Sequence, residues 1–219
     1  DVELMGVSGV TVSGHATIRV NNTGANVNRT ISIPTGGSVT VNVNNGELSF
    51  GGALNLQVAG QTLSGNFSFS RETVNAQSIL TVTASNVSMG FGDGTTQFVT
   101  VSNGSGVFRL MNGGMAGVLG ATIGFNVPGV SFGGTFKLSL NTINSVVTLP
   151  GVTPVTLPAG PYVKVEGTGV SLTVANQTLS GNFAFEQYTG LAVGAGVAPK
   201  ITKIVATGIT MDIGGVVSL

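Results

Sequence analysis

The sequence contains no cysteine and no tryptophan, and only 7% of its 219 residues are charged. The absence of cysteine excludes disulfide bonds and thiolate metal sites. Charged residues make up about 25% of an ordinary soluble domain, so serine, threonine, asparagine, glutamine and glycine must cover most of this surface. The 8 basic and 8 acidic residues cancel. A net charge of zero provides no electrostatic attraction to nucleic acid or to an anionic membrane.

Long apolar runs and targeting signals are also missing. No stretch approaches the roughly 18 consecutive apolar residues that a transmembrane helix requires, so no membrane insertion is expected. The chain opens with Asp1-Val-Glu-Leu-Met5, which lacks the basic and then apolar regions of a secretory signal peptide. We therefore expect both ends to be cuts within a longer protein.

Apolar residues alternate with polar ones along much of the chain. In residues 12–20 the even positions are Val, Gly, Ala, Ile and Val, and the odd ones are Ser, His, Thr and Arg. Residues 39–43, 54–58 and 132–140 follow the same period of two, which is typical of strands. One apolar and one polar face favour antiparallel pairing. We predict an all-β fold of antiparallel meanders in stacked sheets, similar to a β-sandwich and elongated by tandem repeats, with a β-solenoid as the alternative.

Turn-forming residues separate these alternating segments. Glycine accounts for 35 residues, and asparagine often precedes it. Such pairs adopt positive φ angles in tight turns. The region from Pro150 to Pro161 resembles a linker, but its valine and threonine content favours an ordered loop. The predicted turns are Asn44-Asn-Gly46, Ala59-Gly60, Asp93-Gly94, Asn103-Gly104 and Asn112-Gly-Gly114.

An internal repeat is the strongest signal in the sequence. Residues 60–69 return as residues 176–185 with most positions identical, an offset of 116 (176 − 60). Ala84 to Met89 matches Ala206 to Met211, an offset of 122 (206 − 84). Tandem units of fixed period indicate a repeat architecture. We predict a first β repeat at residues 1–125 and a second, truncated one at residues 126–219.

The two copies retain residues that matter for folding and change those that carry chemistry. Leu63-x-Gly65-x-Phe67 is kept in the second copy, where Gly181 takes the place of Gly65. Period-two alternation places these residues on one inward face, so each glycine lies among large side chains. By contrast, His15 corresponds to Thr135. We infer that the repeat preserves a scaffold.

Few residues are candidates for chemistry. His15 is the only histidine, and without partners it cannot form a metal site or a catalytic triad. A glycosidase needs two carboxylates across a cleft, and Glu166 and Glu186 form the most plausible pair. Gly90-Phe-Gly-Asp-Gly94 is the nearest approach to a calcium loop, but it holds one acid, which favours a turn. We therefore expect no catalytic, cofactor-binding or metal-binding residues, and a protein that is not an enzyme.

Two long phrases, Leu157 to Gly169 and Leu172 to Glu186, resemble repeats of giant bacterial exported proteins with an LEPR-XLL type sorting motif. The resemblance covers most of the chain, although the sorting motif itself is absent. It implies an extended extracellular or cell-surface polymer, and it supplies no catalytic residues.

The expected function is structural. The sequence is interpreted as an extracellular segment of a rod, stalk or self-assembling filament, with copies of itself or adjacent repeats as head-to-tail partners. A surface with few charges and no net charge favours such self-association. The alternative is an adhesin-type binding module that recognises a glycan or an ordered surface through faces rich in threonine, asparagine and serine.

Overall fold

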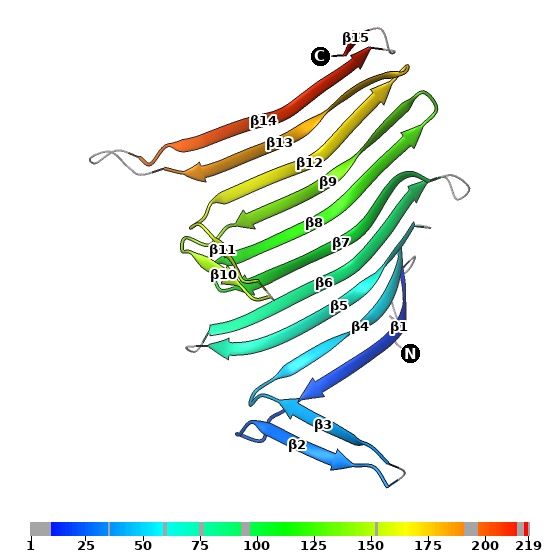
Figure 1. Cartoon of the computed structure of the whole chain (residues 1–219). Coiled ribbons are helices and arrows are strands. Elements are labelled where there is room, and N and C mark those ends of the chain that lie inside the picture. Colours follow the sequence, from blue (N-terminus) through cyan, green and yellow to red (C-terminus); the bar gives the residue numbers. More distant parts are fainter. Residues whose placement is uncertain are drawn as a thin grey trace.

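The computed structural model describes residues 10–34, 36–58, 61–74, 77–92, 97–151, 153–190, 197–213 and 217–218. These residues form strands and connections, with no helix among them (Figure 1). The predicted all-β, antiparallel fold class is confirmed.

One large antiparallel sheet dominates the protein. Its strand order is β1-β4-β5-β6-β7-β8-β9-β12-β13-β14-β15, so it is a meander interrupted only at the two places where a small hairpin is inserted. Every neighbouring pair in this sheet is antiparallel, whereas a solenoid stacks parallel strands. The strands are β1 (Val10–Val20), β4 (Leu48–Val58), β5 (Gln61–Val74), β6 (Gln77–Gly92), β7 (Gln97–Met111), β8 (Gly114–Val127), β9 (Val130–Asn141), β12 (Tyr162–Val174), β13 (Gln177–Thr189), β14 (Lys200–Ile213) and β15 (Val217–Ser218).

Two hairpins form separate two-stranded sheets. The first contains β2 (Val27–Ser32) and β3 (Ser38–Val43), and the second contains β10 (Val147–Leu149) and β11 (Val155–Leu157). The region between Pro150 and Pro161, predicted to be an ordered loop, contains strand β11 of the second hairpin, whose first strand β10 ends just before Pro150. Both hairpins point toward the N-terminal side of the large sheet, and β2–β3 extends past its edge strand β1 (Figure 1).

The connectivity of the strands repeats along the chain. Strand β1, hairpin β2–β3 and strands β4, β5 and β6 are followed, after β7 and β8, by β9, hairpin β10–β11, β12, β13 and β14. The pairing of Leu63 with Met89 recurs as the pairing of Leu179 with Met211. The sheet is continuous where residue 125 was predicted to end the first repeat, because β8 extends to Val127 and pairs with β9. The division into two domains stays a prediction.

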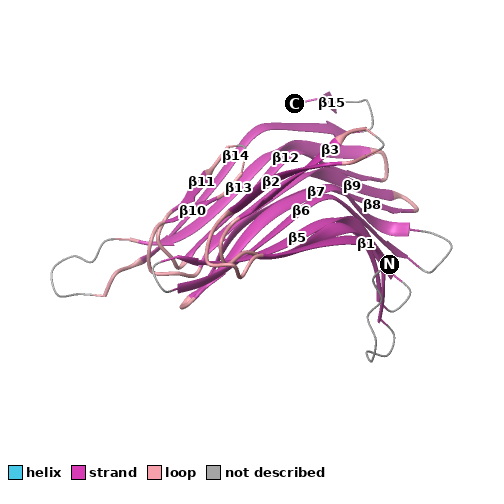
Figure 2. Cartoon of the chain, turned by 90° about the horizontal axis from the view of Figure 1, so that it is seen from below, coloured by secondary structure: helices cyan, strands magenta, loops and turns pink. Residues whose placement is uncertain are grey.

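A line of irregular residues crosses the sheet and bends its strands. Asn86, Asn103, Gly169 and Gly208 have φ angles of 52°, 54°, 58° and 59° and lie within strands, where the pairing register shifts. A bulge of this kind bends its strand and increases the local twist. The bulges lie at matching register positions on β6, β7, β12 and β14, and the sheet bends along the line that joins them (Figure 2). The predicted turn at Asn103-Gly104 was therefore wrong: the positive φ serves a bulge inside β7.

Two of the other predicted turns are confirmed. Asn44-Asn-Gly46 and Asn112-Gly-Gly114 do form turns, with Gly46 and Gly113 at φ angles of 73° and 97°. Ala175 and Asn176 form the two-residue connection of the β12–β13 hairpin, both at positive φ. Residues 59–60 and 93–94 lie outside the described residues.

The densest core lies where the second hairpin packs on the large sheet. Val147, Leu149 and Leu157 from the hairpin meet Ala116 of β8 and Tyr162 of β12, and all five are buried. The stacking of sheets is therefore confined to this region, and much of the large sheet is a single layer.

Candidate functional site

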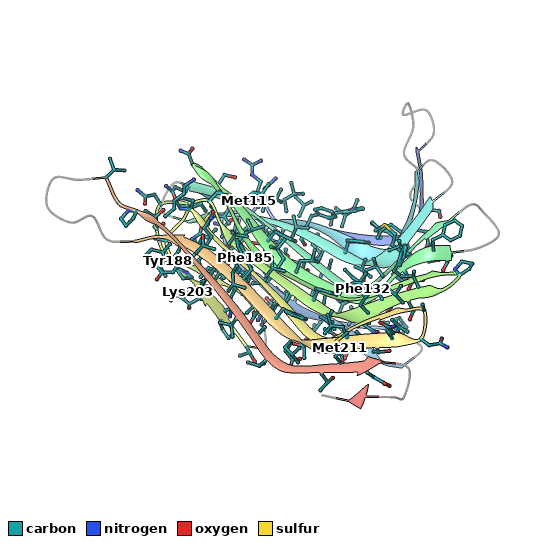
Figure 3. The ribbon with its side chains drawn as sticks, turned by 90° about the horizontal axis from the view of Figure 1, so that it is seen from above. Met115, Phe132, Phe185, Tyr188, Lys203 and Met211 are labelled. Atoms are coloured by element: carbon teal, nitrogen blue, oxygen red, sulfur yellow. The ribbon has the colours of Figure 1, made fainter. Side chains whose placement is uncertain are left out.

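The two faces of the large sheet differ in chemistry, and the bend makes one of them concave. Figure 3 shows Phe132, Phe185 and Met211 on the inner side of the bend and Tyr188 and Lys203 on its outer side. We call these the inner face and the outer face. Directly paired residues share a face. The strand registers therefore assign the other described side chains of the large sheet to the inner or the outer face.

The inner face is apolar. One cross-strand row runs from β1 to β14 without a polar side chain, and nine phenylalanines of the described residues lie on this face. The row consists of Ala16, Gly52, Phe67, Ala84, Gly106, Leu119, Leu138, Val165, Phe185 and Ile204. The nine rings are those of Phe50, Phe67, Phe69, Phe108, Phe125, Phe132, Phe136, Phe183 and Phe185.

The outer face is mainly polar, and its apolar side chains gather beneath the second hairpin. Ile201 and Val205 of β14 are further apolar residues on this face. Val107 and Val118, on β7 and β8, are the apolar side chains against which this hairpin packs. Arg109 of β7 ties the hairpin down, since its Nη1 donates a hydrogen bond to the Thr148 carbonyl oxygen (3.2 Å) and its Nη2 pairs with Glu72. Val107 and Val118 therefore form an apolar patch on which the hairpin packs, and we call this patch the footprint of the hairpin.

An open groove of about 850 Å³ runs along the outer face beside the hairpin. Apart from the hairpin residues Pro150, Gly151, Thr153 and Val155, its lining comes mainly from β6, β7, β8 and β9. Hydroxyl and amide groups suit hydrogen bonding to a polar, uncharged ligand. The polar lining residues are Thr83, Ser85, Asn103, Ser105, Thr122, Thr135, Lys137 and Thr153.

The two carboxylates singled out from the sequence lie on adjacent strands of the outer face. Glu166 pairs with Lys164 of its own strand (2.7 Å between Nζ and Oε1). Glu186 pairs with Lys203 (3.8 Å) and accepts a hydrogen bond from the Tyr162 hydroxyl (3.3 Å). Neither carboxylate lines the groove beside the hairpin. The pair belongs to a network of surface charges and does not flank a cleft.

Tyr162 is the one group of this network whose ionisation is strongly perturbed. Burial against the hairpin disfavours the phenolate, and the negative charge of Glu186 disfavours it further. Together these effects raise the pKa of Tyr162 to about 12. The neighbouring Tyr188 ring lies 4.9 Å from the Lys203 ammonium, a cation–π contact. The cluster holds β12, β13 and β14 together.

The remaining candidates are not brought into a common site. His15 is exposed on the outer face of β1, and Asp93 lies outside the described residues. Within the described ranges no three His, Cys, Asp or Glu side chains are grouped to hold a metal ion. No described helix is long and apolar enough to cross a membrane.

Sequence reasoning missed the groove and the hairpin footprint. The signal was present as a break in alternation, because Val107 and Val118 are apolar at outer-face positions where serine and threonine are usual. Comparison with protein-family models, with curated proteins and with solved structures found no match.

Proposed function

We propose that the chain is a structural repeat segment of an extracellular or cell-surface rod, stalk or filament. The observation that carries the proposal is the position of the second hairpin. Hairpin β10–β11 follows β9, the first strand of the second copy, yet it packs backward onto β7 and β8 of the first copy. A hairpin of one unit therefore clasps the strands of the unit before it.

Hairpin β2–β3 has the same amphipathic design but extends past β1. Its polar side chains include the cross-strand pair Thr30 and Thr40, whereas Ile31 and Val39 form a pair on the other side. Ile31 and Val39 are 57% and 51% exposed. Such side chains pair favourably with an apolar footprint of the kind that Val107 and Val118 provide. In another copy that footprint is covered by its own β10–β11 hairpin. In a head-to-tail contact the partner surface would be the outer face of β14, where Val205 is 53% exposed.

The edges of the large sheet agree with this arrangement. Strand β14 occupies the place of β6, which pairs with β7, and β1 occupies the place of β9, which pairs with β8. The short strand β15 pairs with Asp212 and Ile213 at one end of β14 and leaves the rest of that edge open among the described residues. Alternation of strand direction makes β14 and β1 antiparallel, so a second copy can extend the sheet head to tail. A contact of this kind does not close on itself and produces an open filament.

Sedimentation across a concentration series, followed by electron microscopy, tests the proposal. We expect concentration-dependent association and elongated particles. The double variant Ile31→Lys, Val39→Lys should weaken association, and the matched variant Thr30→Lys, Thr40→Lys on the polar side of the same hairpin should not. A protein that stays monomeric at its highest soluble concentration would contradict self-assembly.

The groove beside the hairpin offers a second candidate function, an adhesin-type binding module, because hydroxyl and amide groups lie among its mainly apolar lining. Threonine, serine and asparagine side chains along its wall match the hydrogen-bonding groups of a neutral glycan. Affinity electrophoresis with neutral polysaccharides tests this, because a bound polysaccharide slows migration. Thr83→Val should reduce the retardation if the groove is the binding site.

A further inference from the structure

The inner face exposes more apolar surface than a soluble protein normally leaves open. Ile18 and Ile204, on the two outermost long strands, are 66% and 77% exposed, and Phe69 and Phe185 are 36% exposed. Ten long strands about 4.8 Å apart, each spanning roughly ten residues at about 3.3 Å, give a face on the order of 1,500 Å². The largest apolar patch of a typical monomer is about 300–600 Å². The inner face is thus a candidate binding surface.

The shape and charge of the protein restrict what can cover this face. The outer face of another copy is convex, but it carries Lys164, Glu166, Glu186 and Lys203, whose charges would be buried unsolvated. The inner face of another copy is also concave, so two such faces would meet at their margins and leave a space between them. A flexible apolar chain, by contrast, adapts to a concave floor.

The charges of the inner face lie along one margin. Arg71 is four residues beyond Phe67 on β5, and Lys200 pairs with Thr189, which is four residues beyond Phe185 on β13. Strands β5 and β13 run in the same direction, so both cations border the same side of the apolar row. Both are exposed, and within the described residues neither forms an ion pair. No acidic residue of the described strands shares this face.

We propose that the inner face binds long-chain anionic amphiphiles, with fatty acids as the simplest members of the class. The acyl chain lies on the phenylalanine and leucine floor, and the carboxylate lies at the margin beside either Arg71 or Lys200. These two residues are on β5 and β14, roughly 34 Å apart at about 4.8 Å per strand. The central row has no hydrogen-bonding side chains, which excludes a polar chain. The positive charges at one margin set the orientation of the ligand, with its carboxylate at that margin. This site is separate from the hairpin contacts and the sheet edges that support self-assembly.

Displacement of cis-parinaric acid by saturated fatty acids, all below their critical micelle concentrations, tests the proposal on the intact chain. Because each buried methylene strengthens binding by about fourfold, affinity should rise steadily from laurate to palmitate. Hexadecanol, which has no charge, should bind several-fold more weakly than palmitate. The double variant Arg71→Gln, Lys200→Gln should remove this difference and leave the dependence on chain length unchanged.

A matched pair of variants places the site. Leu119→Glu puts a carboxylate in the centre of the floor and should weaken palmitate binding at least tenfold. Ser131→Glu puts the same charge on the outer face of the adjacent strand β9, outside the groove beside the hairpin, and should have no effect. Circular dichroism melts identify a Leu119 variant that fails to fold, in which case Ile204→Glu at the edge replaces it.

Three results would overturn the proposal. The first is the absence of displacement by palmitate from the unaltered chain. The second is an equal loss of binding in the Leu119 and Ser131 variants. The third is a stable dimer that fatty acid does not perturb and that Leu119→Glu dissociates, which would assign the inner face to a second copy. None of these results depends on whether the chain forms filaments.

Discussion

Asn21 and Asn141 anchor the two hairpins with the same set of hydrogen bonds. Each side-chain amide donates to the carbonyl oxygen four residues ahead (2.8 Å in both) and to a carbonyl oxygen on the returning side of its hairpin (2.9 and 2.6 Å). Each side-chain oxygen accepts the backbone N–H two residues ahead (3.0 and 2.9 Å). The two asparagines are 120 residues apart (141 − 21) and are 3% and 0% exposed.

Replacing either asparagine with alanine should destabilise the protein. The substitution leaves one N–H and two carbonyl groups without their partner, and each buried unsatisfied group costs about 1–3 kcal/mol. We expect Asn141→Ala to lower the free energy of unfolding more than Asn21→Ala does, since its hairpin forms the core. Urea titration measures both. A larger loss at Asn21 would show that the first hairpin carries more of the stability.

The glycines that the repeat retains should resist enlargement. A Cβ atom on Gly65 would lie 2.9 Å from Val87 Cγ2 and 3.2 Å from Phe67 Cε2, and one on Gly181 would meet the Ile209 side chain. Gly65→Val should therefore overpack the inner face and destabilise the protein by about 1–3 kcal/mol. Denaturant titration measures the change.

Gly46 provides the contrast for this experiment. It lies in a turn at a φ angle of 73°, and a Cβ atom added there would have no other atom within 4 Å. Gly46→Val should therefore act through backbone strain alone, and Gly46→Asn should restore much of the stability because asparagine tolerates positive φ. If Gly65→Val is neutral, the assignment of Gly65 to a crowded inner face is wrong.

Alternation in the sequence was enough to predict the strands and their two faces. The even-numbered residues of β1 do share one face, as the pairing of Gly14 with Leu54 and of Ile18 with Phe50 confirms. The bend was not predictable in this way. Asn103 with positive φ is compatible with both a turn and a bulge, and only pairing with neighbouring strands distinguishes them.

The candidate sites were less predictable than the fold. Alternation places Glu166 and Lys164 on one face of the same strand, but the pairing of Glu186 with Lys203 follows from the register of β13 with β14. The concave inner face and the groove depend on the shape of the whole sheet. Local pattern determines which side chains share a face, whereas curvature arises from the alignment of bulges far apart in the sequence.

The high pKa of Tyr162 has a direct spectroscopic test. The chain has two tyrosines and no tryptophan, so Tyr188→Phe leaves Tyr162 as the only chromophore that ionises near 295 nm. We expect its midpoint at about pH 12. Because the folded pKa exceeds the ordinary value of 10.0, the folded state holds the proton more tightly. This stabilisation is fully present below pH 10 and is lost as the pH rises toward 12. A midpoint near pH 10 would contradict the buried, Glu186-linked environment.

Removal of metal should have no effect on stability. Residues 90–94, the nearest approach to a calcium loop in the sequence, contain a single acid, Asp93. We expect excess EDTA to leave the melting temperature unchanged. A fall of more than about 5 °C, which corresponds to roughly 1–2 kcal/mol in a domain of this size, would reveal a bound cation.

Arg109 should determine how firmly the β10–β11 hairpin is held on β7 and β8. Its guanidinium connects Glu72 of β5 to the Thr148 carbonyl of β10, and it is the only side chain in the described ranges that joins all three segments by hydrogen bonds. Arg109→Ala should destabilise the hairpin by about 1–2 kcal/mol, since hydrogen bonds to charged groups contribute about 1.5–3 kcal/mol and partial exposure reduces the ion pair. Hydrogen exchange should then accelerate in β10 and β11 before it does in β7.

The lysine variant at this position separates charge from geometry. Arg109→Lys keeps the positive charge near Glu72 but lacks the planar fork that reaches two acceptors at once. We expect its exchange rates in β10 and β11 to fall between those of the unaltered chain and those of Arg109→Ala. Equal rates in the unaltered chain and the alanine variant would show that apolar packing of Val147, Leu149 and Leu157 alone holds the hairpin. The attachment of the hairpin to β7 and β8 would then depend on packing alone, and Arg109 would not contribute to its stability.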